Sequence, residues 1–204
     1  MNRSPGNRQF HYGCLIIPDM EHHLGDGADI RLNIGAGETE WGDVRLDIDR
    51  TDHVTVVGDM HSLPFADNVC SEILLDNVIE HSPDTTGVLR EIHRVLRPGG
   101  IVYIYVPYYN AHGAYGDPTH RSFFTEDTFN YYTEASDYDY YADFEFQHVS
   151  ESFFYSKLLR FVPSERIKLK LGHMIGDLVL AMKVVLRKAG ADPVEPSIDG
   201  WIQS

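Results

Sequence analysis

The chain of 204 residues is long enough for one complete hydrophobic core and too short for two comfortable domains, so we expect a single domain over residues 1–204. Its 43% apolar and 24% charged residues are typical of a globular protein. The net charge of −14 is uneven: residues 1–150 carry 25 acidic against nine basic side chains, whereas residues 151–190 carry three against eight. Because an acidic field repels polyanions, a nucleic-acid partner is not expected.

Residues 1–29 are rich in Gly, Asn, Asp and His and indicate a loosely ordered N-terminal lead-in. They lack the charged and apolar regions of a secretory signal, and no stretch reaches the eighteen apolar residues of a membrane span. Cys14 and Cys70 have no metal-ligand spacing and are expected as reduced thiols. The His22–His23 pair has no spaced partner ligands. We therefore expect a soluble, cytoplasmic protein with no metal site and no membrane partner, of open oligomeric state.

An apolar strand, a glycine turn and a second apolar strand follow each other in residues 31–49, RLNIGAGETEWGDVRLDID. Glycine after a buried strand accepts unusual backbone dihedrals and lets the main chain approach a ligand. A carboxylate at the end of the next strand can accept hydrogen bonds from a ribose diol. Asp47 and Asp49 both stand there, and Asp47 is favoured. Alternatively, the glycines form a tight turn that binds nothing.

The elements that follow alternate between strand and helix. Residues 53–57 (HVTVV) and 71–76 (SEILLD) predict strands, separated by the loop GDMHSLPFAD. Residues 84–96 predict a helix, because apolar side chains recur there at three- and four-residue spacing, and RPGG ends it. Residues 101–106 (IVYIYV) predict another buried strand. This order is typical of an α/β protein with a parallel sheet.

Residues 107–141 are dense in Tyr, His, Asp and Phe and indicate a lid-like insertion that faces a substrate, with a helix at residues 125–132. Residues 144–155 and 177–187 predict two long strands that pair antiparallel at the edge of the sheet. Residues 191–204 form a tail.

Taken together, these segments resemble the class I S-adenosylmethionine-dependent methyltransferases, in particular the small, compact ones. The resemblance covers residues 31–106 and rests on five motifs in order: LNIGAG, RLDID, GDMHSLPF, LLDNVIEH and EIHRVLRPGG. It implies a Rossmann-like sheet whose parallel strands are followed by an antiparallel C-terminal pair. It also implies S-adenosyl-L-methionine as the cofactor.

The resemblance further implies which residues hold the cofactor. Gly35 and Gly37 would let the backbone approach the methionine part, Asp47 would bind the ribose hydroxyls, Asp59 and Met60 would flank the adenine, and Asn77 would close the site near the sulfonium. The implied set is Asn33, Gly35, Ala36, Gly37, Asp47, Asp59, Met60 and Asn77.

The chain departs from the family pattern at one place: only residues 35–43 separate the first two strands. A parallel crossover usually takes a dozen or more residues, so the first helix is expected to be a turn or two at most. A dinucleotide's pyrophosphate relies on a helix N-terminus, whereas S-adenosylmethionine carries no phosphate. The short connection therefore favours S-adenosylmethionine over NAD(P).

Methyl transfer needs a nucleophile held in line with the methyl group, and often a base. The best candidates lie in GDPTHRSFF, where Asp117 and His120 would orient and deprotonate a hydroxyl or amine and Arg121 would bind an anionic group on the acceptor. Alternatively, Asp117 caps a turn before Pro118 and His120 is structural. Aromatic and polar side chains that could line the acceptor pocket are Tyr108, Tyr109, His112 and Tyr115.

Two functions of different class remain open. The favoured one is a methyltransferase acting on a small-molecule, sugar or peptide-like acceptor. The other is a catalytically silent cofactor-binding protein that acts as a partner or regulatory subunit, through the basic segment from Lys157 to Lys170.

Overall fold

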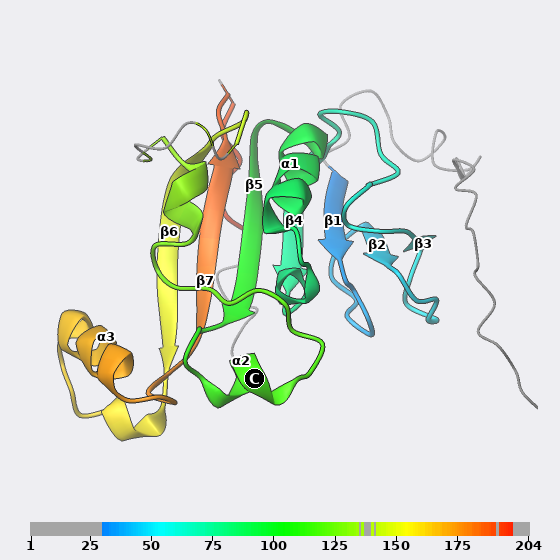
Figure 1. The fold of residues 1–204 in the computed structure, drawn as a ribbon. Coiled ribbons are helices and arrows are strands. Elements are labelled where there is room, and N and C mark those ends of the chain that lie inside the picture. The colour runs from blue at the N-terminus through cyan, green and yellow to red at the C-terminus, as the bar shows by residue number, and fades with distance from the viewer. Residues whose placement is uncertain (1–29, 135, 137–139, 141, 191, 198–204) are drawn as a thin grey trace, which may run out of the picture.

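The computed structural model describes residues 30–134, 136, 140, 142–190 and 192–197, so the predicted lead-in of residues 1–29 lies outside the described residues. They form a seven-stranded sheet in the order β3-β2-β1-β4-β5-β7-β6 (Figure 1). The first five strands are parallel, and β7 is antiparallel to both neighbours, β5 and β6. This confirms the predicted class. The strands are β1 Ile30–Ile34, β2 Val44–Asp47, β3 Val56–Val57, β4 Cys70–Asp76, β5 Leu96–Pro107, β6 Phe146–Tyr155 and β7 Val179–Lys188.

The long helix α1, Thr85–Val95, packs against one face of the sheet and lies in front of β4 and β5 in Figure 1. The apolar pattern of the helix explains this packing, because one buried stripe is formed by Val88, Leu89, Ile92 and Val95. Asp84 caps the N-terminus by accepting a 2.9 Å hydrogen bond from the Gly87 N–H. The other helices are α2 His112–Gly116, α3 Glu165–Met174 and the 3-10 turns η1 Ile79–His81, η2 Phe129–Tyr132 and η3 Lys157–Leu159.

The central strands β4 and β5 are buried on both faces, as their continuous apolar runs predict. One face joins the main core beneath α1. On the other, a smaller cluster includes Leu74, Tyr103 and Val185, and Val194 of the tail packs against it. The tail is held there by a 2.9 Å bond from Val194 N–H to the Gly99 carbonyl. Residues 192–197 thus cover part of the sheet.

Two expectations on local structure need correction. The third strand was expected over residues 53–57, but only Val56–Val57 pair with β2. The helix expected over residues 125–132 is a 3-10 turn confined to Phe129–Tyr132. The backbone bonds here span three residues, as in a 3-10 turn: the Thr128 N–H donates to the Thr125 carbonyl at 3.1 Å and the Asn130 N–H to the Asp127 carbonyl at 3.2 Å. No helix lies between β1 and β2, in keeping with the short connection.

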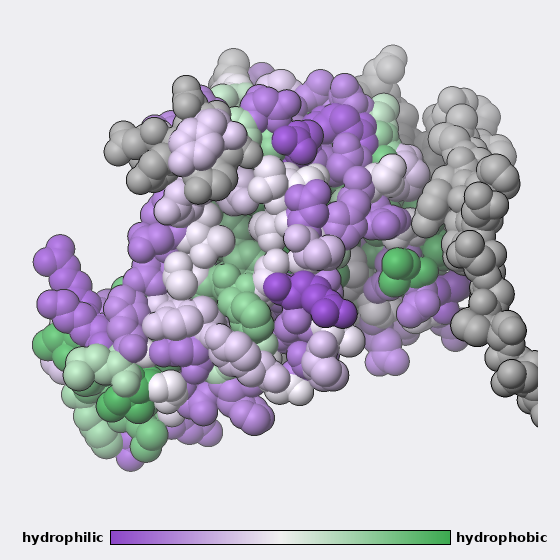
Figure 2. Space-filling model, viewed as in Figure 1, coloured by the Kyte–Doolittle hydropathy of each residue, from purple (hydrophilic) through white to green (hydrophobic). Residues whose placement is uncertain are grey.

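Apolar side chains gather on the surface around η3 and α3, the green area at the lower left of Figure 2. Phe161 and Met174 are about four-fifths exposed there, at 80% and 82%, and Leu158 is similarly open. Lys157 and Arg160 flank them in the sequence. None of the described helices has the length and apolar character to cross a membrane. Cys70 is a buried free thiol whose pKa burial raises to about 12, and Cys14 lies outside the described residues.

Candidate active site

A crevice of about 430 Å³ opens at the carboxyl ends of β1, β2 and β4. This is where parallel α/β sheets bind ligands, and the volume lies in the range of small-molecule sites. Its wall combines apolar side chains with a few carboxylates and imidazoles. The lining residues are Ile34, Gly35, Leu46, Asp47, Ile48, Gly58, Asp59, Met60, His61, Asn77, Val78 and His81.

The glycine turn after β1 forms one wall of the crevice. Gly35 has a φ of +69°, and its N–H donates to the Leu46 carbonyl at 2.8 Å, which ties the turn to β2. A Cβ at Gly35 would lie 2.3 Å from Cγ2 and 2.7 Å from Cβ of Val78. Both the backbone angle and the close approach of Val78 therefore require glycine at this position.

Asp47 lies at the end of β2 and lines the crevice, whereas Asp49 does not. Its Oδ2 accepts from the Gly37 N–H at 2.9 Å, and its Oδ1 accepts from the Asp49 N–H at 3.0 Å. These bonds orient the carboxylate and leave lone pairs on both oxygens, since each oxygen can accept more than one bond. The geometry thus suits Asp47 for a diol, and its role at a ribose stays a prediction.

The loop after β3 brings Asp59 and Met60 to the opposite wall, with His61 beside them. Asp59 Oδ1 accepts from the backbone N–H of His61 at 2.9 Å and lies 2.7 Å from its ring Nδ1. Burial alone would raise the pKa of Asp59, but these bonds from His61 outweigh it and lower the pKa. His61 Nε2 is 2.7 Å from Ser82 Oγ. His61 was not among the expected site residues, and its place directly after Asp59-Met60 was the available signal.

Asn77 follows β4 and lines the crevice. It has a positive φ of 51°, uncommon outside glycine and often found at functional sites. Its N–H donates to the Tyr105 carbonyl at 2.9 Å, and its Nδ2 donates to Asp76 Oδ1 at 2.8 Å. Burial raises the pKa of Asp76, and the bond from Asn77 partly offsets this.

Three of the expected cofactor residues do not line the crevice. Asn33, within β1, and Ala36, in the turn, are buried, each 2% exposed. Gly37 has a φ of +52°, and its N–H is used by Asp47. Direct contact of these three residues with a cofactor stays a prediction.

Next to the crevice, Glu80, His81 and His120 form a cluster whose possible ligand atoms all lie within 4.8 Å of one another. Glu80 is 1% exposed, and neither carboxylate oxygen has a hydrogen-bond partner among the described residues. Burial raises its pKa to about 7, although the nearby His120 acts in the opposite direction. His81 belongs to both the cluster and the crevice wall. His120 was among the residues expected from the sequence, whereas Glu80 and His81 were not.

The segment from Asp117 to Ser122 folds back onto η1 and brings His120 to the cluster. The N–H groups of Arg121 and Ser122 donate to the Glu80 carbonyl at 2.7 and 3.0 Å. Asp117 Oδ1 accepts from both the backbone N–H and the hydroxyl of Thr119, at 2.8 and 2.6 Å, which is the turn-capping role named as the alternative. The His120 N–H donates to the Asp117 carbonyl at 3.3 Å, but the Asp117 carboxylate is bonded to Thr119 and the His120 ring to the Ala114 carbonyl.

The residues expected to line an acceptor pocket are scattered. Tyr108 is fully buried in the core and donates its hydroxyl to Glu126 at 2.6 Å, so it is not available as a pocket wall. Tyr109 packs partly buried against the same core. Tyr115 is 64% exposed and stacks on Phe123 at 4.6 Å between ring centroids.

His112 and Arg121 are exposed, and neither lines the crevice. The His112 N–H donates to Asp177, which joins α2 to the start of β7. A second hollow, of about 240 Å³, lies beside η2 and shares no lining residue with the crevice. The acceptor roles of these side chains stay predictions.

Comparison with known proteins gives a family for the part of the chain that builds this crevice. Residues 36–104 match the methyltransferase domain family. The sterol 24-C-methyltransferase erg6 of Schizosaccharomyces pombe is 37% identical over 62 residues, which are 30% of this chain and 16% of that protein. The chain therefore spans about a sixth of that relative's length in the match.

Solved structures share the fold at low identity. A SAM-dependent methyltransferase from Archaeoglobus fulgidus superimposes with a TM-score of 0.57 and 18% identity, over 82% of this chain and 90% of that one. The [4+2]-cyclase SpnF gives a TM-score of 0.53 and 15% identity, over 80% and 77%. These likenesses establish the architecture and not the reaction.

S-adenosylmethionine is the methyl donor of the matched family, and the crevice fits it. Gly35 leaves no room for a Cβ, Asp47 presents free lone pairs, and the two carboxylates Asp47 and Asp59 suit a cationic sulfonium. Residues 36–104 match the methyltransferase domain family, and the described residues have the fold of the class I S-adenosylmethionine-dependent methyltransferases.

Proposed function

We propose that the chain is an S-adenosylmethionine-dependent methyltransferase that acts on a hydroxyl or amino group of a small-molecule, sugar or peptide-like acceptor. One observation carries the proposal. His81 lines the crevice and also belongs to the cluster with Glu80 and His120, so the cofactor site adjoins groups that can accept a proton. The net charge of −14 opposes a nucleic-acid acceptor.

In this proposal the crevice holds the cofactor through Asp47, Asp59 and the backbone at Gly35. Asp47 accepts the ribose hydroxyls, Asp59 accepts from the adenine amino group, and Met60 packs on the ring. Asn77 stands beside the sulfonium. The left-handed backbone at Asn77 supports this role, because strain of this kind is retained where a group must be held in one place.

The bound cofactor supplies a methyl group on a sulfonium, which passes to the acceptor's oxygen or nitrogen while the sulfur keeps the electron pair of the broken bond. The residues around it must orient the acceptor and take its proton. His120 suits the second task. Its Nδ1 lies 2.9 Å from the Ala114 carbonyl, which can only accept, so Nδ1 carries the hydrogen and Nε2 keeps its lone pair.

Calorimetry with S-adenosylmethionine and with S-adenosylhomocysteine tests the cofactor site. We expect stoichiometric binding of both, weakened in Asp47→Ala and retained in Asp49→Ala. Methyl transfer is then followed as S-adenosylhomocysteine release with a panel of sugars, peptides, phenols, amines and sterols. No binding of either nucleoside by the folded protein would overturn the proposal.

A second candidate is the catalytically silent subunit. The exposed apolar side chains of Leu158, Phe161 and Met174 favour it, because a partner protein would cover such a surface. The two functions separate in the same experiment. A silent subunit binds the cofactor but releases no S-adenosylhomocysteine with any acceptor unless a partner is added.

A further inference from the structure

The cluster of Glu80, His81 and His120 brings a buried carboxylate close to two imidazole rings. Both oxygens of the buried Glu80 carboxylate have no partner among the described residues. A buried, unpaired carboxylate is costly and is normally satisfied by a hydrogen bond, a counter-charge or a metal ion. The three possible ligand atoms nevertheless lie within 4.8 Å of one another.

The hydrogen bonds around the cluster determine which nitrogen of each imidazole is free. The Thr119 hydroxyl donates to Asp117 at 2.6 Å, so it accepts from His81 Nδ1 at 2.9 Å. His120 Nδ1 donates to the Ala114 carbonyl at 2.9 Å. Each ring therefore carries its hydrogen on Nδ1 and keeps the lone pair on Nε2. Metal-binding histidines are held in the same way, with the second ring nitrogen donating to an oxygen.

We propose that Glu80, His81 and His120 bind a divalent first-row transition-metal ion at the acceptor side of the crevice. Two imidazole nitrogens and one carboxylate suit Zn²⁺, Mn²⁺ or Fe²⁺ and leave coordination positions open. At bond lengths of 2.0–2.2 Å such an ion holds its ligand atoms about 3 to 3.5 Å apart, so binding draws these side chains together by about an ångström. The carboxylates of Asp76 and Asp117 add negative potential around Glu80.

The site's part in catalysis rests on the proposed function. An ion in this place binds an acceptor hydroxyl through an open position and lowers the pKa of that hydroxyl. The hydroxyl then loses its proton to water, and its oxygen bonds to the methyl carbon as the bond from that carbon to sulfur breaks. His120 acts on the acceptor through the ion in this account and is not required as a free base. The inference thus narrows the acceptor to one with a hydroxyl group.

Titration of the untagged, chelator-treated chain with Co²⁺ tests the site, because Co²⁺ bound by nitrogen and oxygen ligands absorbs visible light. We expect one site per chain in the wild type. Glu80→Gln keeps the shape of the side chain but removes its charge, and we expect it to weaken Co²⁺ binding at least tenfold. His120→Ala should do the same. Calorimetry with Zn²⁺ gives an independent measure.

His148→Ala is the matched control, because His148 is an exposed imidazole on β6 outside the cluster. It should bind Co²⁺ as the wild type does. Any weak binding by His11, His22 and His23 is common to all four proteins and cancels in the comparison. Equal binding by the four proteins, or no Co²⁺ absorption in the wild type, would overturn the inference. Circular dichroism verifies folding, and His120→Asn replaces His120→Ala if the latter unfolds.

Calorimetry with S-adenosylmethionine on the same samples separates this inference from the proposed function. Cofactor binding without a metal site would leave the methyltransferase proposal in place and remove the metal ion. Metal binding without cofactor binding would keep the metal site and overturn the methyltransferase proposal. Glu80→Gln should leave the cofactor affinity within about twofold of wild type, because Glu80 does not line the crevice.

Discussion

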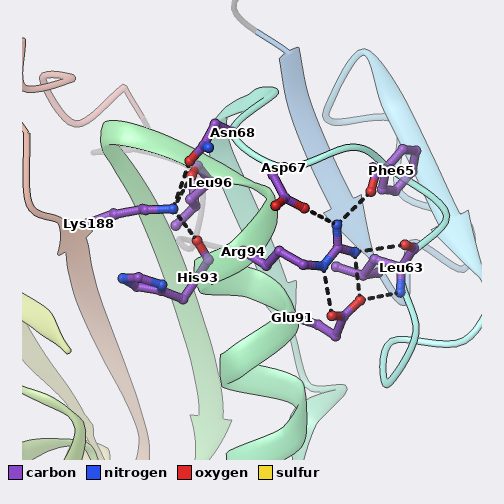
Figure 3. A network of polar contacts seen from close by, with 9 residues as sticks. All are labelled: Leu63, Phe65, Asp67, Asn68, Glu91, His93, Arg94, Leu96 and Lys188. Carbon is purple, nitrogen blue, oxygen red and sulfur yellow. Dashed lines mark hydrogen bonds and ion pairs between the residues drawn. The ribbon is translucent and has the colours of Figure 1, made fainter. Parts of the chain in front are cut away.

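Arg94 and Glu91, one turn apart on α1, are joined by two hydrogen bonds of 2.8 Å, from Nε to Oε1 and from Nη2 to Oε2 (Figure 3). The same guanidinium donates to the backbone carbonyls of Leu63 and Phe65, at 3.0 and 2.8 Å, while Glu91 accepts from the Leu63 N–H at 2.8 Å. The pair therefore attaches the loop that carries Asp59 and Met60 to the helix. A planar guanidinium can serve these acceptors together, whereas an ammonium group cannot.

Arg94→Lys should lower the free energy of unfolding by about 1 to 2 kcal/mol and weaken S-adenosylmethionine binding severalfold, because the loop loses its carbonyl contacts. Urea unfolding and calorimetry measure the two effects. The matched control is Arg90→Lys, on the same helix as Arg94. This substitution alters an exposed ion pair with Asp143 and should change the free energy of unfolding by less than about 1 kcal/mol. Equal effects of the two substitutions would contradict the anchoring role.

Gly35→Ala should destabilise the protein by at least about 2 kcal/mol, because an alanine Cβ meets Cβ of Val78 as well as its methyl groups and cannot be avoided by rotating Val78. Gly37→Ala is the control. It also has a positive φ, but nothing lies within 4 Å of the new Cβ, so it should cost only about 1 kcal/mol. Thermal unfolding in the absence of cofactor compares them. Similar losses of stability in the two variants would show that glycine is required at position 35 because of the backbone angle and not because of Val78.

Asp47→Ala should weaken S-adenosylmethionine binding by about 2 to 3 kcal/mol, since it removes a charge-assisted acceptor for two hydroxyls. Asp49→Ala should bind nearly as the wild type does, because Asp49 is not among the residues that line the crevice. Calorimetry gives both affinities. A larger loss in Asp49→Ala would transfer the ribose role to that residue.

His120→Ala should lower turnover by about a hundredfold to ten-thousandfold and leave S-adenosylmethionine affinity near wild type. The drop is expected whether the imidazole acts as a free base or holds a metal ion. Initial rates with an acceptor found in the panel measure it, with His148→Ala as control. Preserved turnover per folded molecule, together with a lower melting temperature, would make His120 structural. Lost acceptor affinity at full maximal turnover would make the segment a specificity lid.

His93 should make the protein less stable in mild acid. Burial, followed by the positive charge of Lys188, lowers the pKa of His93 from 6.5 to about 4. Between these two pH values the unfolded chain binds a proton that the folded chain does not, so stability falls as the pH falls through that window. The loss should be about 1 to 2 kcal/mol after allowance for partial exposure.

Urea unfolding of wild type and His93→Gln at pH 7 and at pH 4.5 measures this effect. The wild type should lose stability relative to His93→Gln over that range, because glutamine does not titrate. His148→Gln removes an exposed imidazole and should follow the wild type. Parallel pH curves for the wild type and His93→Gln would contradict the assignment.

The fold was largely predictable because burial leaves periodic traces in the sequence. Leu89, Ile92 and Val95 recur along one helical face, and residues 101–106 form an unbroken apolar run, so both elements were recovered. The helix expected at residues 125–132 was half wrong, because the backbone there closes three-residue 3-10 bonds, and the capping signal of Thr125, Glu126 and Asp127 does not distinguish such a turn from an α-helix.

The candidate site was only partly predictable. Gly35, Asp47, Asp59, Met60 and Asn77 all line the crevice, as expected from motifs whose chemistry is local. Glu80 was missed because its burial depends on a segment forty positions later, whose Arg121 and Ser122 N–H groups bind its carbonyl. Tyr108 was assigned to a pocket because aromatic density cannot distinguish a ligand wall from a core, and it is fully buried.

The position of β7 determines the order in which the sheet can be completed. β7 lies between β5 and β6, although it is the last strand of the sheet to be synthesised (Figure 1). Until Val179–Lys188 have left the ribosome, β5 has an open edge and β6 has no neighbour in the sheet. Unpaired strand edges promote association between incomplete chains. A chain that ends between residues 156 and 178 therefore presents an unpaired edge of β5 and an unpaired β6, and both favour association between incomplete chains.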